Sequence, residues 1–120
     1  MFDRFGKADQ SPQPEDNWEV SLDADLIRVR DKAGAERSVA RSALSAVAIE
    51  TNDSGPWGAD LWWLLFDADD RLACAFPQGA TGEQAAVDYL LTLPIFDHDA
   101  MVRAMASTGN AIFPVWRRPV

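Results

Sequence analysis

The stretch DLWWLLFD, residues 60–67, decides the fold of this chain. Side chains of a β-strand alternate between two faces. One face would carry Leu61, Trp63 and Leu65, and the other would carry Trp62, Leu64 and Phe66. An antiparallel strand that is apolar on both faces is typically central. We therefore predict that one face packs on a core and that the other is covered by helices, a long loop or a partner subunit.

Shorter strand patterns lie on both sides of this segment. Upstream patterns cover residues 18–22, 26–30, 36–40 and 43–51, and turn-forming residues separate them. Downstream, residues 72–76 form another strand, in which Ala73 and Ala75 leave room for a large neighbour. Residues 111–116 form a last strand, where Pro114 favours an edge position because proline has no N–H to donate.

Two helices are predicted between the last two strands. The first covers residues 83–93, with Thr81 and Gln84 at the spacing of a capping box near its start and Pro94 directly after it. The second covers residues 98–107, with Asp97 as its N-cap. The sequence therefore predicts an α+β fold, with a bent antiparallel sheet of six or seven strands packed against two consecutive C-terminal helices and a final edge strand.

The length of 120 residues suits a single domain. Residues 6–17 contain two prolines and hardly an apolar side chain. We therefore predict a flexible N-terminal arm over residues 1–17, one α+β domain over residues 18–116 and a loose tail over residues 117–120.

The charge balance excludes several classes of partner. Acidic residues number 19 against 11 basic ones, which gives a net charge of -8. Such a chain is repelled by nucleic acid and by anionic membranes. A single cysteine, Cys74, cannot form an intrachain disulfide, and the N-terminal sequence lacks the apolar region of a signal peptide. We therefore expect a cytoplasmic protein that binds neither nucleic acid nor membrane.

His98 lies between Asp97 and Asp99. Histidine and aspartate side chains can both act as general acids or bases in catalysis. Adjacent residues at a helix start point in different directions, and carboxylates there also cap the helix. Capping is the favoured interpretation; a small enzyme or small-ligand-binding protein that uses His98 with Asp97 or Asp99 is the alternative. One cysteine and one histidine are too few for a zinc site, so neither a metal nor a cofactor is predicted.

Five tryptophans are many for this length. We expect Trp18, Trp116 and one of the adjacent pair Trp62 and Trp63 in the core, and Trp57, in a Gly-Pro loop, exposed. The leading hypothesis is a non-enzymatic interaction module that binds a protein partner or forms a homodimer, with Trp57 and Trp62 or Trp63 as anchors. A narrower version is an immunity-type inhibitor of a basic toxin, which the acidic charge permits.

Several local motifs occur together between about residues 49 and 116. They are TNDSGPW at 51–57, DLWWL at 60–64, PQGA at 77–80, LPIFD at 93–97 and AMASTGN at 104–110, followed by Phe113 and Trp116. In this string the chain resembles a group of small bacterial proteins of unknown function, which implies no activity and no site residue. More loosely, strands followed by a helix are similar to bacterial pleckstrin-homology-like domains, although the second helix and last strand depart from them.

Overall fold

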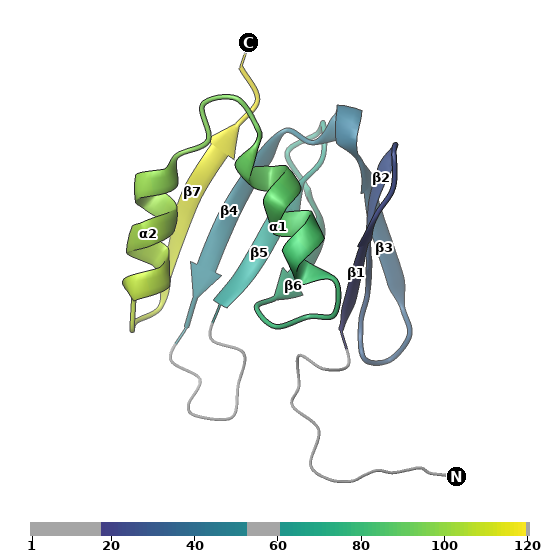
Figure 1. Ribbon diagram of the computed structural model, residues 1–120, viewed down its shortest axis with the longest axis horizontal. Helices are drawn as coiled ribbons and strands as arrows, with labels where there is room; N and C mark the ends of the chain where they lie inside the picture. The colour runs from purple at the N-terminus through teal and green to yellow at the C-terminus, as the bar shows by residue number, and fades with distance from the viewer. Residues whose placement is uncertain (1–17, 53–60, 120) are drawn as a thin grey trace, which may run out of the picture.

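The structure is a computed structural model that describes residues 18–52 and 61–119 (Figure 1). The described residues form seven strands and two α-helices. In chain order they are β1 (Glu19–Leu22), β2 (Leu26–Arg30), β3 (Glu36–Ala40), β4 (Ala46–Thr51), β5 (Leu61–Phe66), β6 (Leu72–Pro77), α1 (Glu83–Leu91), α2 (His98–Ala106) and β7 (Ala111–Arg117). The predicted α+β class is therefore confirmed.

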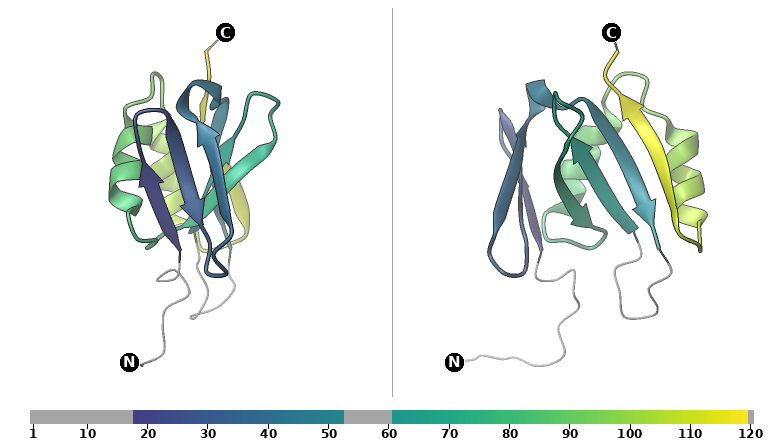
Figure 2. Two further views of the ribbon diagram at one scale, coloured as in Figure 1. Left: turned by 90° about the vertical axis from the view of Figure 1, so that its right-hand side faces the viewer. Right: turned by 180° about the vertical axis from the view of Figure 1, so that it is seen from behind.

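The strands belong to two antiparallel sheets. Strands β1, β2 and β3 form a meander, and the other four are arranged in the order β6-β5-β4-β7. Strands β3 and β6 lie side by side, and both helices lie on one side of the four-stranded sheet (Figures 1 and 2). The predicted bent sheet is thus divided in two between β3 and β6. The prediction of a final edge strand is confirmed by the position of β7.

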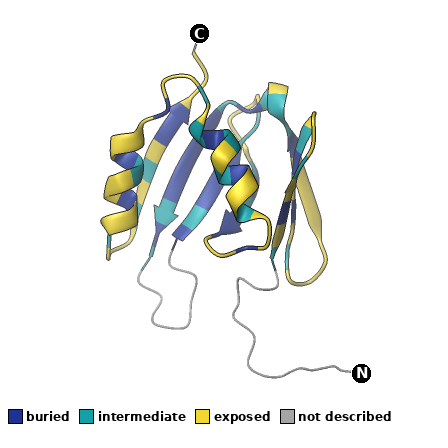
Figure 3. Cartoon of the chain, in the orientation of Figure 1, coloured by how far each residue is buried: buried dark blue, intermediate teal, exposed yellow. Residues whose placement is uncertain are grey.

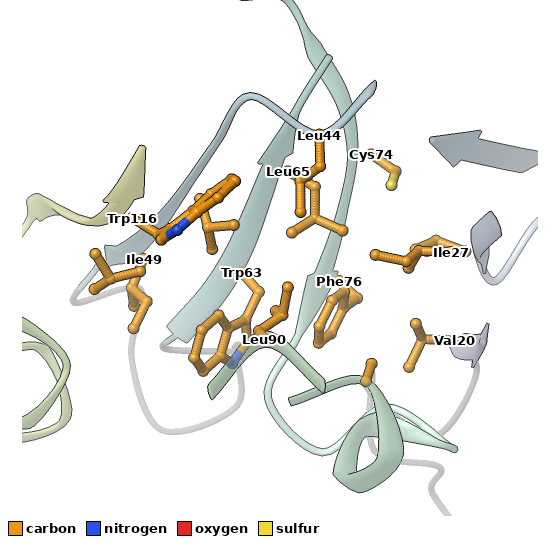
Figure 4. Packing of buried hydrophobic residues seen from close by; sticks show 14 of the residues in the cluster. Val20, Ile27, Leu44, Ile49, Trp63, Leu65, Cys74, Phe76, Leu90 and Trp116 are labelled. Carbon is orange, nitrogen blue, oxygen red and sulfur yellow. The ribbon is translucent and has the colours of Figure 1, made fainter. Parts of the chain in front are cut away.

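The core lies between the sheets and the helices. Trp63 is fully buried, and its ring stacks on Phe76 with the ring centroids 6.4 Å apart. Leu90 of α1 and Ile49 of β4 are also fully buried in this cluster (Figure 4). Buried residues are most continuous along β4 and β5, whereas the outward sides of both helices are exposed (Figure 3).

The two helices begin in different ways. The predicted N-cap of α2 is confirmed, because the Asp97 carboxylate accepts a hydrogen bond from the Ala100 N–H at 2.9 Å. The predicted capping box of α1 is wrong, since the N-cap is Gly82 in a left-handed conformation without a side-chain cap. Thr81 instead pairs through its backbone with the start of β1: its N–H donates to Trp18, and its carbonyl accepts from Val20.

The C-terminal residues continue the fold beyond the boundary expected at residue 116. Strand β7 extends to Arg117. The Arg118 N–H donates to the Ser45 carbonyl, and its side chain donates to the carbonyls of Leu44 and Ser42. Neither helix of the described chain is long and apolar enough to cross a membrane.

Candidate functional site

The face of the four-stranded sheet that points away from the helices is largely apolar. The register places its side chains in rows across the strands: Phe66, Ala46 and Arg117; Ala75, Leu64, Ala48 and Pro114; Trp62, Glu50 and Ile112. We call this the outer face. Seen from behind, no helix of the described residues lies over it (Figure 2). The three-stranded sheet differs, because its outward side carries exposed ion pairs such as Arg30 with Glu19.

A groove with a volume of about 450 Å³ crosses the outer face. Its lining includes Ala46 and Ala48 of β4, between Phe66 of β5 and Ile112 and Pro114 of β7. Because alanine side chains are short, the larger neighbours on both sides stand above them. The exposed fraction of Ile112 is 60%. The site is therefore an apolar trough with an unshielded aliphatic wall, which is typical of surfaces that bind other molecules.

Charged side chains lie at the border of this groove. Asp70 and Arg117 line it and form an ion pair at 3.4 Å, and the Ser45 hydroxyl donates to the Asp70 carboxylate at 2.9 Å. Asp97 also lines the groove, and Glu50 lies on the same face opposite Ile112. The groove itself is lined by two carboxylates, Asp70 and Asp97, and one guanidinium, Arg117, so its charged lining is acidic by one charge.

Ile95 borders the groove in an unusual backbone conformation. Its φ is +55°, a region that costs an L-residue about 1–2 kcal/mol and is rare for a β-branched one. Adjacent bonds fix this turn: the Trp116 indole N–H donates to the Pro94 carbonyl, and the Asp97 N–H donates to the Val115 carbonyl. The exposed fraction of Ile95 is 77%. The fold thus holds an apolar side chain in water beside the groove.

The tryptophans occupy different environments. Trp57 lies outside the described residues. Trp63 is fully buried, so it is the member of the adjacent pair Trp62 and Trp63 that lies in the core. Trp62 is half-buried on the outer face, and its ring meets Trp18 edge-on with centroids 5.1 Å apart. Trp62 is thus the member of the adjacent pair that lies on the surface bearing the groove.

The three residues of the acid–base alternative, Asp97, His98 and Asp99, differ in their contacts and exposure. The Asp97 carboxylate caps α2, while His98 and Asp99 are exposed. The His98 ring lies against Phe96, with the centroids 4.9 Å apart. Neither His98 nor Asp99 lines the groove or the second cavity described below.

Asp97→Ala is expected to lower the free energy of unfolding by about 1 kcal/mol, because the substitution removes the N-cap bond. His98→Ala is the control and should change stability by less than about 0.5 kcal/mol, since the residue is exposed. Urea unfolding of both variants measures the difference. Equal stability of Asp97→Ala and the unsubstituted protein would contradict the capping role.

A second, smaller cavity of about 230 Å³ lies between the three-stranded sheet and β6. Its lining includes Trp18, Ala73, Ala75, Arg37 and Cys74. We call this cavity the seam. Trp18 is a large neighbour on the same side of β6 as the two alanines, as the sequence predicted. Burial raises the pKa of the Cys74 thiol to about 11, against the opposing attraction of the Arg37 guanidinium.

The raised pKa of Cys74 predicts a loss of stability in alkaline solution. Between pH 9 and pH 11 the unfolded chain releases the thiol proton while the folded chain retains it, so the free energy of unfolding falls as pH rises. The loss should reach about 2 kcal/mol at pH 11. Because other groups titrate as well, the measurement is the stability difference between the unsubstituted protein and Cys74→Ala. The stability difference between the unsubstituted protein and Cys74→Ala should narrow between pH 9 and pH 11. A constant difference would show that the Cys74 thiol does not cause the alkaline loss of stability.

Comparison of the chain with protein-family models, curated proteins and solved structures finds no match.

Proposed function

We propose that this protein is a non-enzymatic interaction module that binds an apolar segment of another protein, bordered by basic residues, in the outer-face groove. The single observation that carries the proposal is the groove itself, with small Ala46 and Ala48 between larger apolar side chains. Exposed Ile95 and Ile112 would be anchors, because binding energy concentrates in a few apolar residues that a partner desolvates.

The volumes of the two cavities and the capping role of Asp97 favour this proposal over a small enzyme or a small-ligand-binding protein that uses His98. The groove volume of about 450 Å³ lies within the range of about 300–1,000 Å³ that is usual for binding sites, whereas the seam, at about 230 Å³, lies below it. The acid–base alternative has less support, since the carboxylate of Asp97 already caps α2. A ligand-binding role that uses His98 would also need a cavity at that residue.

The charge of the border indicates the chemistry of the partner. With Asp70 and Asp97 in the groove lining and Glu50 on the same face, basic side chains next to an apolar segment would gain favourable electrostatic contacts. A second copy of the chain would bring its own net charge of -8, and the two copies would repel each other. We therefore favour a different, basic protein over a homodimer, and an immunity-type inhibitor of a basic toxin is one such case. The buried free thiol of Cys74 suits a cytoplasmic location.

Ile112→Asp is expected to weaken selective peptide binding without unfolding the protein. The experiment selects displayed random peptides on the full chain, and we expect enrichment of peptides that combine two bulky apolar residues with Lys or Arg. The affinity of an enriched peptide should fall at least about tenfold for Ile112→Asp, because a charge replaces an anchor.

Val102→Asp is the matched control, because Val102 is 61% exposed on α2 and Ile112 is 60% exposed on the groove wall. It should bind the enriched peptide like the unsubstituted protein. Equal losses in both variants, or no enrichment at all, would overturn the proposed function.

A further inference from the structure

We propose that the seam binds a small apolar α-amino acid, with Arg37 holding the carboxylate of the ligand and Asp31 holding its ammonium group. This site goes beyond the proposed function, because it is a different cavity and takes a ligand of a different class. Three features of the seam support it: two opposite charges that do not pair with each other, an apolar lining and the open edge of β6.

Arg37 lies on the inward face of the three-stranded sheet. The register places it opposite Val29, which is 3% exposed and belongs to the core. Arg28 and Arg30 lie on the outward face of the same sheet, where each forms an ion pair with a carboxylate. Among the described residues, no carboxylate lies within 4 Å of the Arg37 guanidinium. This guanidinium therefore remains available to an anionic group in the seam.

Asp31 supplies the opposite charge at the same cavity. It lies two residues after Val29 and lines the seam. Since Val29 is opposite Arg37, Asp31 is a diagonal neighbour of Arg37, at about 7–8 Å. One Asp31 carboxylate oxygen accepts the N–H groups of Ala33 and Ala35, both at 2.9 Å, and the other accepts none from the described residues. A carboxylate and a guanidinium held apart in this way match a ligand that carries both charges.

The rest of the seam suits an apolar side chain. Ala73 and Ala75 leave room beside Trp18, and Leu72, which also lines the cavity, is 51% exposed. Burial raises the pKa of the Cys74 thiol to about 11, so this group is neutral at neutral pH and does not repel a carboxylate. A cavity of about 150 Å³ is large enough to bind benzene. The seam, with about 230 Å³, therefore has room for a branched aliphatic or a phenyl side chain.

The open edge of β6 adds backbone groups to the seam. Strands β3 and β6 lie side by side but belong to different sheets, and no strand of the described chain pairs with this edge of β6 (Figures 1 and 2). An unpaired strand edge presents N–H and C=O groups, which can bond to the carboxylate and the ammonium group of an amino acid. The bound ligand would contact both sheets and would stabilise the fold.

The first test adds L-leucine, L-phenylalanine or L-valine to the full chain and records amide NMR spectra and the melting temperature. We expect shifts at Ala73, Ala75 and Cys74 together with a higher melting temperature. The resonances of Ala48 and Ile112 should stay in place, because the groove is a separate cavity. No shift at the seam with any of the three amino acids, or shifts at the groove instead, would overturn the proposal.

Arg37→Gln should weaken the binding of the amino acid at least about tenfold, because the carboxylate loses its charged partner. Arg30→Gln is the matched control, since it removes the same side chain from the outward face of the same sheet. It should bind like the unsubstituted protein. Equal losses in the two variants would overturn the role of Arg37.

Two analogues of leucine separate an amino acid from simpler ligands. Isocaproate lacks the ammonium group, and leucinamide lacks the carboxylate. Each should bind at least about tenfold more weakly than leucine, because one of the two charges of the seam stays without a partner. Equal affinity for isocaproate would overturn the role of Asp31 and indicate a simple carboxylic acid. Equal affinity for leucinamide would overturn the role of Arg37.

Discussion

Trp63→Ala is expected to lower the free energy of unfolding by about 3–4 kcal/mol, one of the largest effects of any single substitution in this domain. Truncating a buried tryptophan generally costs about 3–5 kcal/mol through lost apolar burial and a new cavity. Trp63 is fully buried and stacks on Phe76. Its indole N–H finds no acceptor among the described residues, which offsets part of this stabilisation and favours the lower half of the range.

Trp62→Ala is the matched control for this prediction, since it removes the same side chain from the opposite face of β5. Trp62 is half-buried, and its recorded ring contact is with Trp18. Its loss should cost no more than about 1–2 kcal/mol. Urea unfolding followed by far-UV circular dichroism measures both variants without depending on tryptophan fluorescence. Similar costs for the two substitutions would contradict the assignment of the two faces.

Gly82→Ala is expected to cost about 3 kcal/mol, for two reasons that add. The φ of Gly82 is +85°, where an L-residue is strained by about 1–2 kcal/mol. A Cβ atom at this position would also overlap the backbone carbonyl of Val20. That carbonyl belongs to the segment that pairs with Thr81, so the overlap would also disturb backbone bonds worth about 1 kcal/mol each.

Gly34→Ala separates the conformational strain of Gly82→Ala from its overlap with the Val20 carbonyl. Gly34 has nearly the same conformation, with a φ of +88°, but a Cβ atom there would meet nothing within 4 Å. Its substitution should therefore cost only the conformational strain, about 1–2 kcal/mol. The difference between the variants in thermal or urea unfolding reports the contact between Gly82 and β1. No difference would mean that this contact contributes nothing to stability.

Local patterns predicted the elements of the fold because they depend on local physics. The apolar residues within 60–67 occupy both faces of a single strand, whatever surrounds it. Asp97 directly precedes the helix that it caps, so its role depends only on neighbouring residues. The division into two sheets depends instead on how β3 meets β6, which are far apart in sequence. The prediction of a capping box at α1 is wrong for a similar reason, because the backbone of Thr81 pairs with β1, which is distant in sequence.

The groove could be predicted only in part. The sequence predicted two apolar faces on the central strand, but the position of the helices determines which face stays open. The alternation of Ala46 and Ala48 with larger residues was visible, yet only the register places them between Phe66 and Pro114. Ile95 carried no recognisable signal, because a β-branched residue gives no reason to expect a positive φ.

Mapping a display-enriched peptide onto the full chain by NMR shows whether the outer face is the binding surface. We expect amide shifts at Ala46, Ala48, Phe66 and Ile112, which line the groove. Resonances of the exposed α2 residue Val102 should stay in place. Shifts confined to α2, or to Arg37 and Cys74 at the seam, would contradict binding at the outer face.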